Sequence, residues 1–112
     1  MNVKEFQTEI TRMRPRSRTA TVRVQKEGKL FSVAAMISGM DKNGIHHSAW
    51  LWAITGKRIY DAEVACAAMK VMLMAFLAKV DVSFFGVPFS ERSRFMEIAN
   101  TLRPTDPTGG QS

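Results

Sequence analysis

The chain has 112 residues, of which 46% are hydrophobic and 23% are charged, which corresponds to one domain with a modest core and excludes a wholly disordered chain. Its single cysteine, Cys66, excludes an intramolecular disulfide and indicates a reducing compartment, so we expect a soluble, cytoplasmic protein. The longest apolar run, residues 64–78, is interrupted by Lys70 and is shorter than the roughly 20 residues that cross a bilayer, so no membrane span is expected.

The net charge of +6 is concentrated near the N-terminus. Residues 1–30 carry eight basic and three acidic side chains, a net of +5, and the remaining residues contribute only +1. Such an asymmetry indicates an anionic partner.

The first part of the chain predicts a short helix followed by three strands. Asn2 and Glu5 have the spacing of a helix cap, and apolar residues then recur at helical intervals, which predicts a helix over residues 3–12 that Pro15 terminates. Alternating, β-branched segments predict strands at residues 19–25, 30–37 and 45–54, the first two joined by a turn at 26–29 with its glycine late. Three consecutive strands with short connections predict an antiparallel meander.

The second part predicts two helices around a short strand. Asp61 is the expected cap of a helix over residues 62–79, which is apolar almost all round and must therefore be covered on more than one side. Residues 80–85 alternate briefly and form a candidate fourth strand. Ser90 is the expected cap of a last helix that ends near residue 102. Its expected buried stripe consists of Phe95, Ile98, Ala99 and Leu102.

The expected fold class is therefore α+β. A three-stranded antiparallel meander, with a short fourth strand as a further element, packs with a central apolar helix and with flanking N- and C-terminal helices. We expect a single domain over residues 1–103, and residues 104–112 have the composition of a flexible tail.

Strand alternation assigns the side chains of the meander to two faces. The face expected to contact the helices is nearly all apolar and comprises Val22, Val24, Phe31, Val33, Ala35, Ile37, Ile45, Ala49 and Leu51. The other face is mixed and comprises Thr21, Arg23, Gln25, Ser32, Ala34, Met36, His46, Ser48, Trp50 and Trp52.

The two tryptophans of the mixed face have several open interpretations. Trp50 and Trp52, with Arg23 on the same face, could stack unpaired bases. They could equally contact a protein partner or a second copy of the chain. In the structural alternatives, the C-terminal helix covers them, or a shifted register places them in the core.

Arginine occupies every second position of a segment near the N-terminus: Arg12, Arg14, Arg16 and Arg18. In an extended conformation, which Pro15 favours, this period places the guanidinium groups on one side. Phosphates suit such a row because a guanidinium group offers a planar donor fork, and the release of counterions adds affinity. An acidic protein or anionic surface, or a solvated linker, are the alternatives, because no groove-reading motif accompanies the run.

A second basic pair, Lys57 and Arg58, follows Gly56 and precedes the central helix. The segment is not a phosphate-binding P-loop, because Leu51 stands where that motif needs glycine and Arg58 where it needs serine or threonine. The pair could still hold a phosphate at the N-terminus of the helix.

The sequence offers no catalytic or metal-binding constellation. His46 and His47 are neighbours in a strand, so they point to opposite faces and cannot chelate one metal ion together. Cys66 lies in an apolar helix, where a thiol is normally inert. We therefore expect no enzymatic activity, no metal and no cofactor.

The α-β-β-β-α order, with the basic residues 56–58 before an alanine-rich helix, resembles a double-stranded-RNA-binding domain over about residues 2–79. That family places its basic cluster in the first turn of the second helix, where this chain has the acidic residues 61–64, and its loop between the first two strands is here only residues 26–29. The resemblance is one of topology, and no binding residues are carried over from it.

Together these features predict a small, non-enzymatic nucleic-acid-binding accessory protein that binds DNA or RNA without strict sequence readout. The candidate binding residues are Arg12, Arg14, Arg16, Arg18, Arg23, Trp50, Trp52, Lys57 and Arg58. The alternative is a homodimeric protein-interaction module, such as an adaptor, inhibitor or assembly factor, that acts through the aromatic sheet face.

Overall fold

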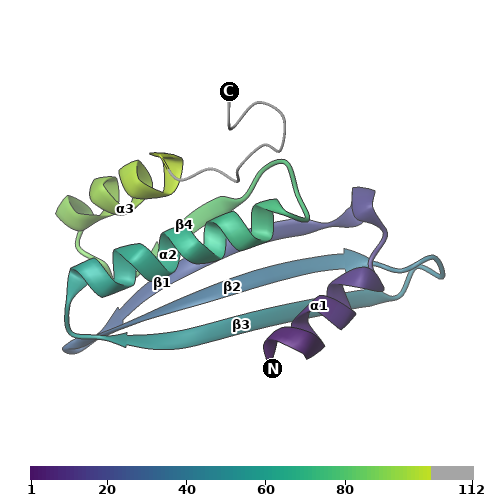
Figure 1. The fold of residues 1–112 in the computed structure, drawn as a ribbon, viewed down its shortest axis with the longest axis horizontal. Coiled ribbons are helices and arrows are strands. Elements are labelled where there is room, and N and C mark those ends of the chain that lie inside the picture. The colour runs from purple at the N-terminus through teal and green to yellow at the C-terminus, as the bar shows by residue number, and fades with distance from the viewer. Residues whose placement is uncertain (102–112) are drawn as a thin grey trace.

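The computed structural model describes residues 1–101, with side chains described as far as Glu97. The elements in chain order are α1 (Val3–Thr11), a 3-10 turn η1 (Pro15–Ser17), β1 (Thr19–Glu27), β2 (Leu30–Met40), β3 (His46–Gly56), α2 (Ile59–Met74), β4 (Asp81–Phe85) and α3 (Phe89–Thr101) (Figure 1). The α+β class and the order of helices and strands expected from the sequence are confirmed. The expected tail at residues 104–112 lies outside the described residues, as do the side chains of Ile98, Ala99 and Leu102.

The four strands form one mixed sheet in the order β3-β2-β1-β4. The meander is antiparallel as expected, and β4 adds to β1 in parallel, with Val82 beside Val22. In the register of the meander, Ala34 lies between Arg23 on β1 and Trp52 on β3. This register confirms that Arg23 and both tryptophans share one face, and the interpretation with a shifted register is wrong.

The first hairpin is tighter than expected. β1 continues to Glu27, so only Gly28 and Lys29 connect it to β2. Gly28 adopts a φ of 61°, and no residue other than glycine has a positive φ among the described residues. A positive φ at the first of the two connecting residues, and not at the second, is typical of a glycine in a type II′ turn. The sequence predicted a longer connection, residues 26–29, with its glycine late.

The core lies between the sheet and three helices that all cover the same face. α1 buries Phe6 and Ile10 completely against this face, and Figure 1 shows α1 and α2 lying across the sheet. Phe95 of α3 packs on the same side, with ring centroids 6.4 Å from Phe31 and 5.9 Å from Phe84. The interpretation in which α3 covers the tryptophans is therefore wrong.

The expected apolar face is confirmed, with one exception. Ile45 lies in the turn before β3 and is 57% exposed. Backbone pairing with β2 begins only at His46, so the alternation that placed Ile45 on the buried face does not reach it.

The central helix is shifted toward the N-terminus relative to its expected bounds of 62–79. Arg58 is its N-cap, and Asp61 lies in the first turn instead. The sheet covers one side of α2, and α3 lies against another, where Glu63 is buried with a carboxylate oxygen 2.8 Å from Nε of Arg94. The sheet and α3 thus cover α2 on two sides within the same chain. The apolar character of α2 therefore does not itself require a second subunit.

Among the described residues, no helix combines the length and the apolar character needed to span a membrane.

Candidate nucleic-acid interface

The arginine segment is not extended, contrary to the sequence-based expectation. Pro15 begins the 3-10 turn η1, because its fixed φ suits the first position of a helical turn. The four arginines consequently do not line one side of a strand. Each has a different environment, and only some of them can serve a ligand.

A close approach to β2 holds this turn in place. The Ser17 hydroxyl donates to the carbonyl oxygen of Arg14 at 2.8 Å and accepts the backbone N–H of Met40 at 2.9 Å. The backbone N–H of Arg14 donates to the Met40 carbonyl at 2.8 Å. Gly39 makes the approach possible, because a Cβ there would lie 2.9 Å from Ser17 Oγ and 3.1 Å from Met13 Cβ.

The four arginines divide into one structural residue and three exposed ones. Arg18 is half-buried and donates from Nε and Nη2 to the carbonyl oxygen of Met13, at 3.2 and 2.9 Å, so it stabilises the turn. Arg12 keeps 59% of its side chain exposed and pairs loosely with Glu9 at 3.4 Å. Arg14 and Arg16 are exposed. Three of the four candidate arginines are therefore accessible to an anion.

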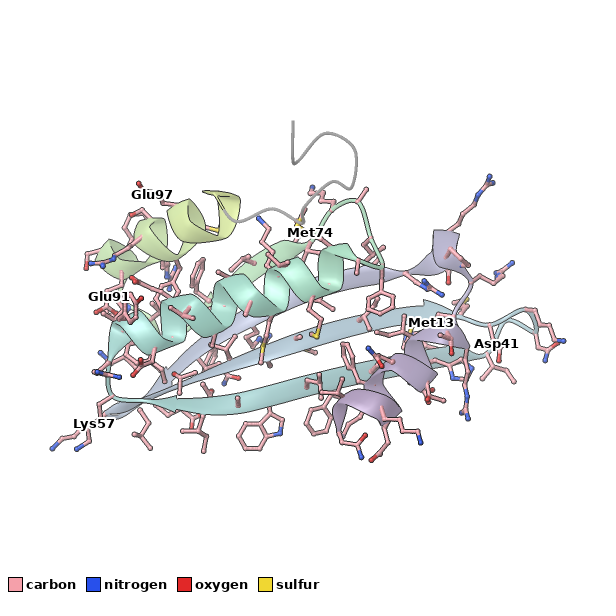
Figure 2. The ribbon with its side chains drawn as sticks, viewed as in Figure 1. Met13, Asp41, Lys57, Met74, Glu91 and Glu97 are labelled. Atoms are coloured by element: carbon pink, nitrogen blue, oxygen red, sulfur yellow. The ribbon has the colours of Figure 1, made fainter. Side chains whose placement is uncertain are left out.

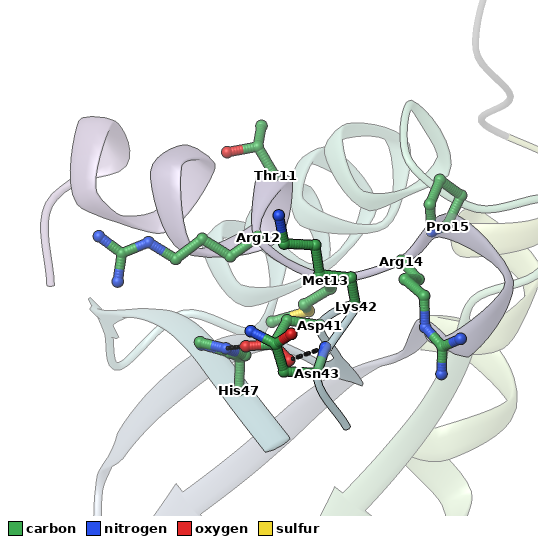
Figure 3. A pocket seen from close by; sticks show the side chains of 9 residues that line it. All are labelled: Thr11, Arg12, Met13, Arg14, Pro15, Asp41, Lys42, Asn43 and His47. Atoms are coloured by element: carbon green, nitrogen blue, oxygen red, sulfur yellow. Dashed lines mark hydrogen bonds and ion pairs between the residues drawn. The ribbon is translucent and has the colours of Figure 1, made fainter. Parts of the chain in front are cut away.

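An open hollow of about 430 Å³ brings two of these arginines together with the turn between β2 and β3. Arg12 and Arg14 line it from the end of α1, and Lys42 and Asn43 line it from the turn (Figure 3). We call Arg12, Arg14, Arg16 and Lys42 the basic end. Lys42 was not predicted from the sequence, because a single lysine within a turn is not a distinctive signal. Lys42 and Arg12 line the same hollow only because α1 crosses the sheet near this turn.

His47 is hydrogen-bonded to two acidic groups at the hollow, and one of them, Asp41, is part of its lining. Its Nδ1 lies 2.7 Å from Oε1 of Glu9, and its Nε2 lies 2.8 Å from Oδ2 of Asp41. The hydrogen bond to Asp41, followed by that to Glu9, raises the pKa of His47 above its ordinary value of 6.5. Hydrogen bonds to His47 thus occupy both carboxylates, and the four cations of the basic end outnumber these two acidic groups.

Asp41 also fixes the shape of the turn. Its Oδ1 accepts the backbone N–H groups of Asn43 at 2.8 Å and Ile45 at 3.0 Å. The hydrogen bond from His47, together with that from Ile45, lowers the pKa of Asp41. The Asp41 carboxylate thus stabilises the turn that contains Lys42.

The second basic pair lies at the opposite end of the sheet (Figure 2 labels Lys57 and Asp41 at the two ends). The Arg58 guanidinium donates to both carboxylate oxygens of Asp61, from Nε at 2.7 Å and from Nη2 at 3.0 Å. Asp61 stands in the first turn of α2, where a bound phosphate would have to lie. The Asp61 carboxylate therefore competes with a phosphate for Arg58 at this helix N-terminus.

The aromatic face of the sheet is separate from the basic end. Trp50, Trp52 and Met36 line a shallow hollow of about 330 Å³ whose floor includes Ala34. Arg23 is exposed on this face, beside Ser83 of β4 and Ala34 of β2.

The charges of this face do not favour a polyanion. By alternation along the strands, Glu27 and Asp81 share the face with Arg23, so its formal charge is not positive. Single-stranded nucleic acids are bound where aromatic side chains and a positively charged groove coincide. The tryptophans here lack that groove, so protein contact is the better interpretation of this face.

No group of three or more histidine, cysteine or acidic residues within the described part of the chain could hold a metal ion. His46 is exposed and His47 faces α1, as their opposite orientations in the strand require. Cys66 is buried, and burial raises the pKa of its thiol to about 11, so the nucleophilic thiolate is scarce at neutral pH.

Comparisons of this chain with protein-family models, with curated proteins and with solved structures each gave no significant match. The fold and the charges described above are therefore the basis on which a function is proposed.

Proposed function

We propose that this chain is a small, non-enzymatic nucleic-acid-binding accessory protein that contacts phosphate groups through its basic end. One observation carries the proposal: Arg12, Arg14 and Lys42, from two segments far apart in sequence, surround one open hollow. The nearest carboxylates, Glu9 and Asp41, are hydrogen-bonded to His47.

A polyanion suits this arrangement better than a small anion does. The hollow is open, and Arg16 extends the positive charge beyond it along η1, so no enclosed cage surrounds a single site. Several phosphates along one backbone can engage cations that are spread in this way, and each contact releases a counterion. The exposed guanidinium groups also offer the planar donor fork that phosphate oxygens accept.

Binding without sequence readout follows from the shape of the basic end. Phosphate contacts position a protein on nucleic acid, whereas base edges must be reached to read a sequence. Arg14 precedes a three-residue turn, Arg16 lies within it, and Lys42 lies in a hairpin. None of these residues stands on a long helix that could enter a major groove.

His47 and Cys66 are the side chains that a catalytic role would use first, and the environments of both favour a binding role instead. Both ring nitrogens of His47 are already hydrogen-bonded to carboxylates, so neither is directed at a substrate. Cys66 lies inside the core.

Two matched double variants test the proposal. Arg14→Ala with Lys42→Ala removes two cations from the basic end, and Lys29→Ala with Lys57→Ala removes two exposed lysines from the other end. Fluorescence anisotropy with labelled single- and double-stranded DNA and RNA of about 20 nucleotides reports affinity. We expect the first pair to weaken binding by at least about tenfold at low salt, because two phosphate contacts are lost, and the second pair by less than about twofold.

Equal losses in the two double variants would show that net charge alone is responsible, and an absence of binding by the wild-type chain would also contradict the proposal. A competition experiment distinguishes nucleic-acid binding from the alternative in which the basic end binds an acidic protein. If polyglutamate displaces the labelled strand as well as unlabelled nucleic acid does, the basic end serves an acidic protein instead.

A further inference from the structure

β3 is an unprotected edge strand. It lies at one end of the sheet order, is eleven residues long, and contains no proline, lysine, arginine, aspartate or glutamate. Natural edge strands are usually short, charged or covered, because their free N–H and C=O groups otherwise pair with another chain. β4, the other edge, has five residues and is followed closely by Pro88. The two edges therefore differ, and only β3 has the features of a strand that pairs further.

The helix layer covers only the first part of β3. Ala49 is buried beneath this layer, whereas Ala53, on the same face and four residues later, is exposed. On the other face, Trp52 is 55% exposed and Ile54 is 61% exposed. The second part of β3 thus presents apolar side chains on one face and bare backbone along its edge.

We propose that a second copy of this chain pairs antiparallel with β3 about a two-fold axis, which joins the two sheets into one. A two-fold contact needs only one self-complementary surface, and an antiparallel strand pair is self-complementary by geometry. The pairing places Trp50 and Trp52 of both copies on one continuous face, where aromatic and β-branched side chains stabilise neighbouring strands.

The distribution of charge favours a second copy as the occupant. The chain carries a net charge of +6, so two copies repel each other wherever their basic surfaces meet. β3 itself carries no permanent charge, and the basic end lies beyond its N-terminal end. Lys57 and Arg58 follow its C-terminal end, where Arg58 is paired with Asp61. Antiparallel pairing through the second part of β3 directs the two basic ends away from each other, so the contact forms without bringing them together.

The interface also has the composition of a stable contact. Protein interfaces are enriched in tryptophan and methionine and depleted in charged residues at their centre. The pairing makes the tryptophans of the two copies neighbours on the joined face, so each loses part of its exposed surface to the others. The exposed Met36 lies directly opposite Trp50 in the sheet and extends the same apolar surface.

Sedimentation equilibrium at about 50 µM tests this inference without any nucleic acid. We expect the wild-type chain at about twice its mass of 12.6 kDa. Ala53→Lys and Trp52→Lys each place a charge on the exposed part of β3 and should give monomers with an unchanged circular dichroism spectrum. Phe85→Lys is the matched control, because Phe85 is equally exposed on the same face of the other edge strand and should leave the dimer intact.

Tryptophan emission provides a second readout, because Trp50 and Trp52 are the only tryptophans in the sequence. On dilution, the emission of the wild-type chain should shift to the red together with the loss of dimer. A wild-type chain that sediments only as a monomer would overturn the inference. A dimer that forms without any change in tryptophan emission, or that Phe85→Lys dissociates as readily as Ala53→Lys, would also overturn it.

Discussion

At the scale of single residues, His47 connects three parts of the fold. It contacts Glu9 of α1 and Asp41 of the turn after β2, and it stands near the start of β3 itself. Strand alternation placed His47 correctly on the face opposite His46, but it indicated no partner for the ring. The two contacts span 38 and 6 residues of sequence, and the longer one depends on where α1 crosses the sheet.

The His47 contacts predict a pH-dependent contribution to stability. The pKa of His47 is raised above its unfolded value of 6.5, so its contribution is complete below about that pH and is lost as the pH rises through the folded value. Asp41 acts in the opposite sense: its lowered pKa makes its contribution present above 3.8 and lost as the pH falls through the folded value. The pair therefore stabilises the fold most between these two values.

Denaturant unfolding of His47→Gln at about pH 5 and about pH 8.5 checks this prediction. The free energy of unfolding should fall below that of the wild type at the lower pH, and the difference should shrink at the higher pH. His46→Gln is the control, because His46 is exposed on the other face, and it should show no such trend. A difference for His47→Gln that is constant, or that grows with pH, would contradict the assignment.

At the scale of elements, local signals predicted the types of helix and strand better than their bounds. Asn2 accepts the backbone N–H of Glu5 at 2.8 Å, as its spacing predicted, and α1 begins there. The first helix ends at Thr11, before Pro15, and Pro15 opens a 3-10 turn instead of an extended segment. A proline fixes only its own φ. The conformation of the residues after it is determined by the contacts of Ser17 with Met40, which lies 23 residues further along the chain.

The central helix provides a test of the core at this scale. Leu73 of α2 is fully buried, whereas Val64 of the same helix is 49% exposed. We expect Leu73→Ala to lower the free energy of unfolding by about 2–5 kcal/mol, because it removes packed methyl groups and leaves a cavity. Val64→Ala should lower it by less than about 1 kcal/mol. Equal losses in denaturant unfolding would show that α2 faces the sheet differently.

At the scale of the whole molecule, the pattern of strand alternation predicted the faces of the sheet but not the interface. A period of two is enough to separate the apolar face from the face of Trp50 and Trp52, and the register confirms that division. The basic end could not be predicted in full, because Lys42 meets Arg12 and Arg14 only once α1 has packed across the sheet. The sequence correctly indicated an N-terminal excess of charge but not the turn that completes it.

The overall arrangement separates two surfaces with different chemistry. Positive charge gathers at the basic end, and apolar side chains gather on the open face and on the edge of β3. A dimer formed through β3 would carry two basic ends, which raises the avidity for a long strand that reaches both.

The salt dependence of nucleic-acid binding tests the central claim most directly. If the four cations of the basic end each neutralise one phosphate of a single strand, log K should fall with log salt concentration with a slope of about −3. Affinity for a strand of about 20 nucleotides should then drop roughly fifty-fold between about 50 mM and about 200 mM salt. Removing Arg14 and Lys42 should make the slope shallower by about 1.4. A slope near zero for the wild-type chain, or an unchanged slope in the double variant, would contradict the assignment of phosphate contacts to the basic end.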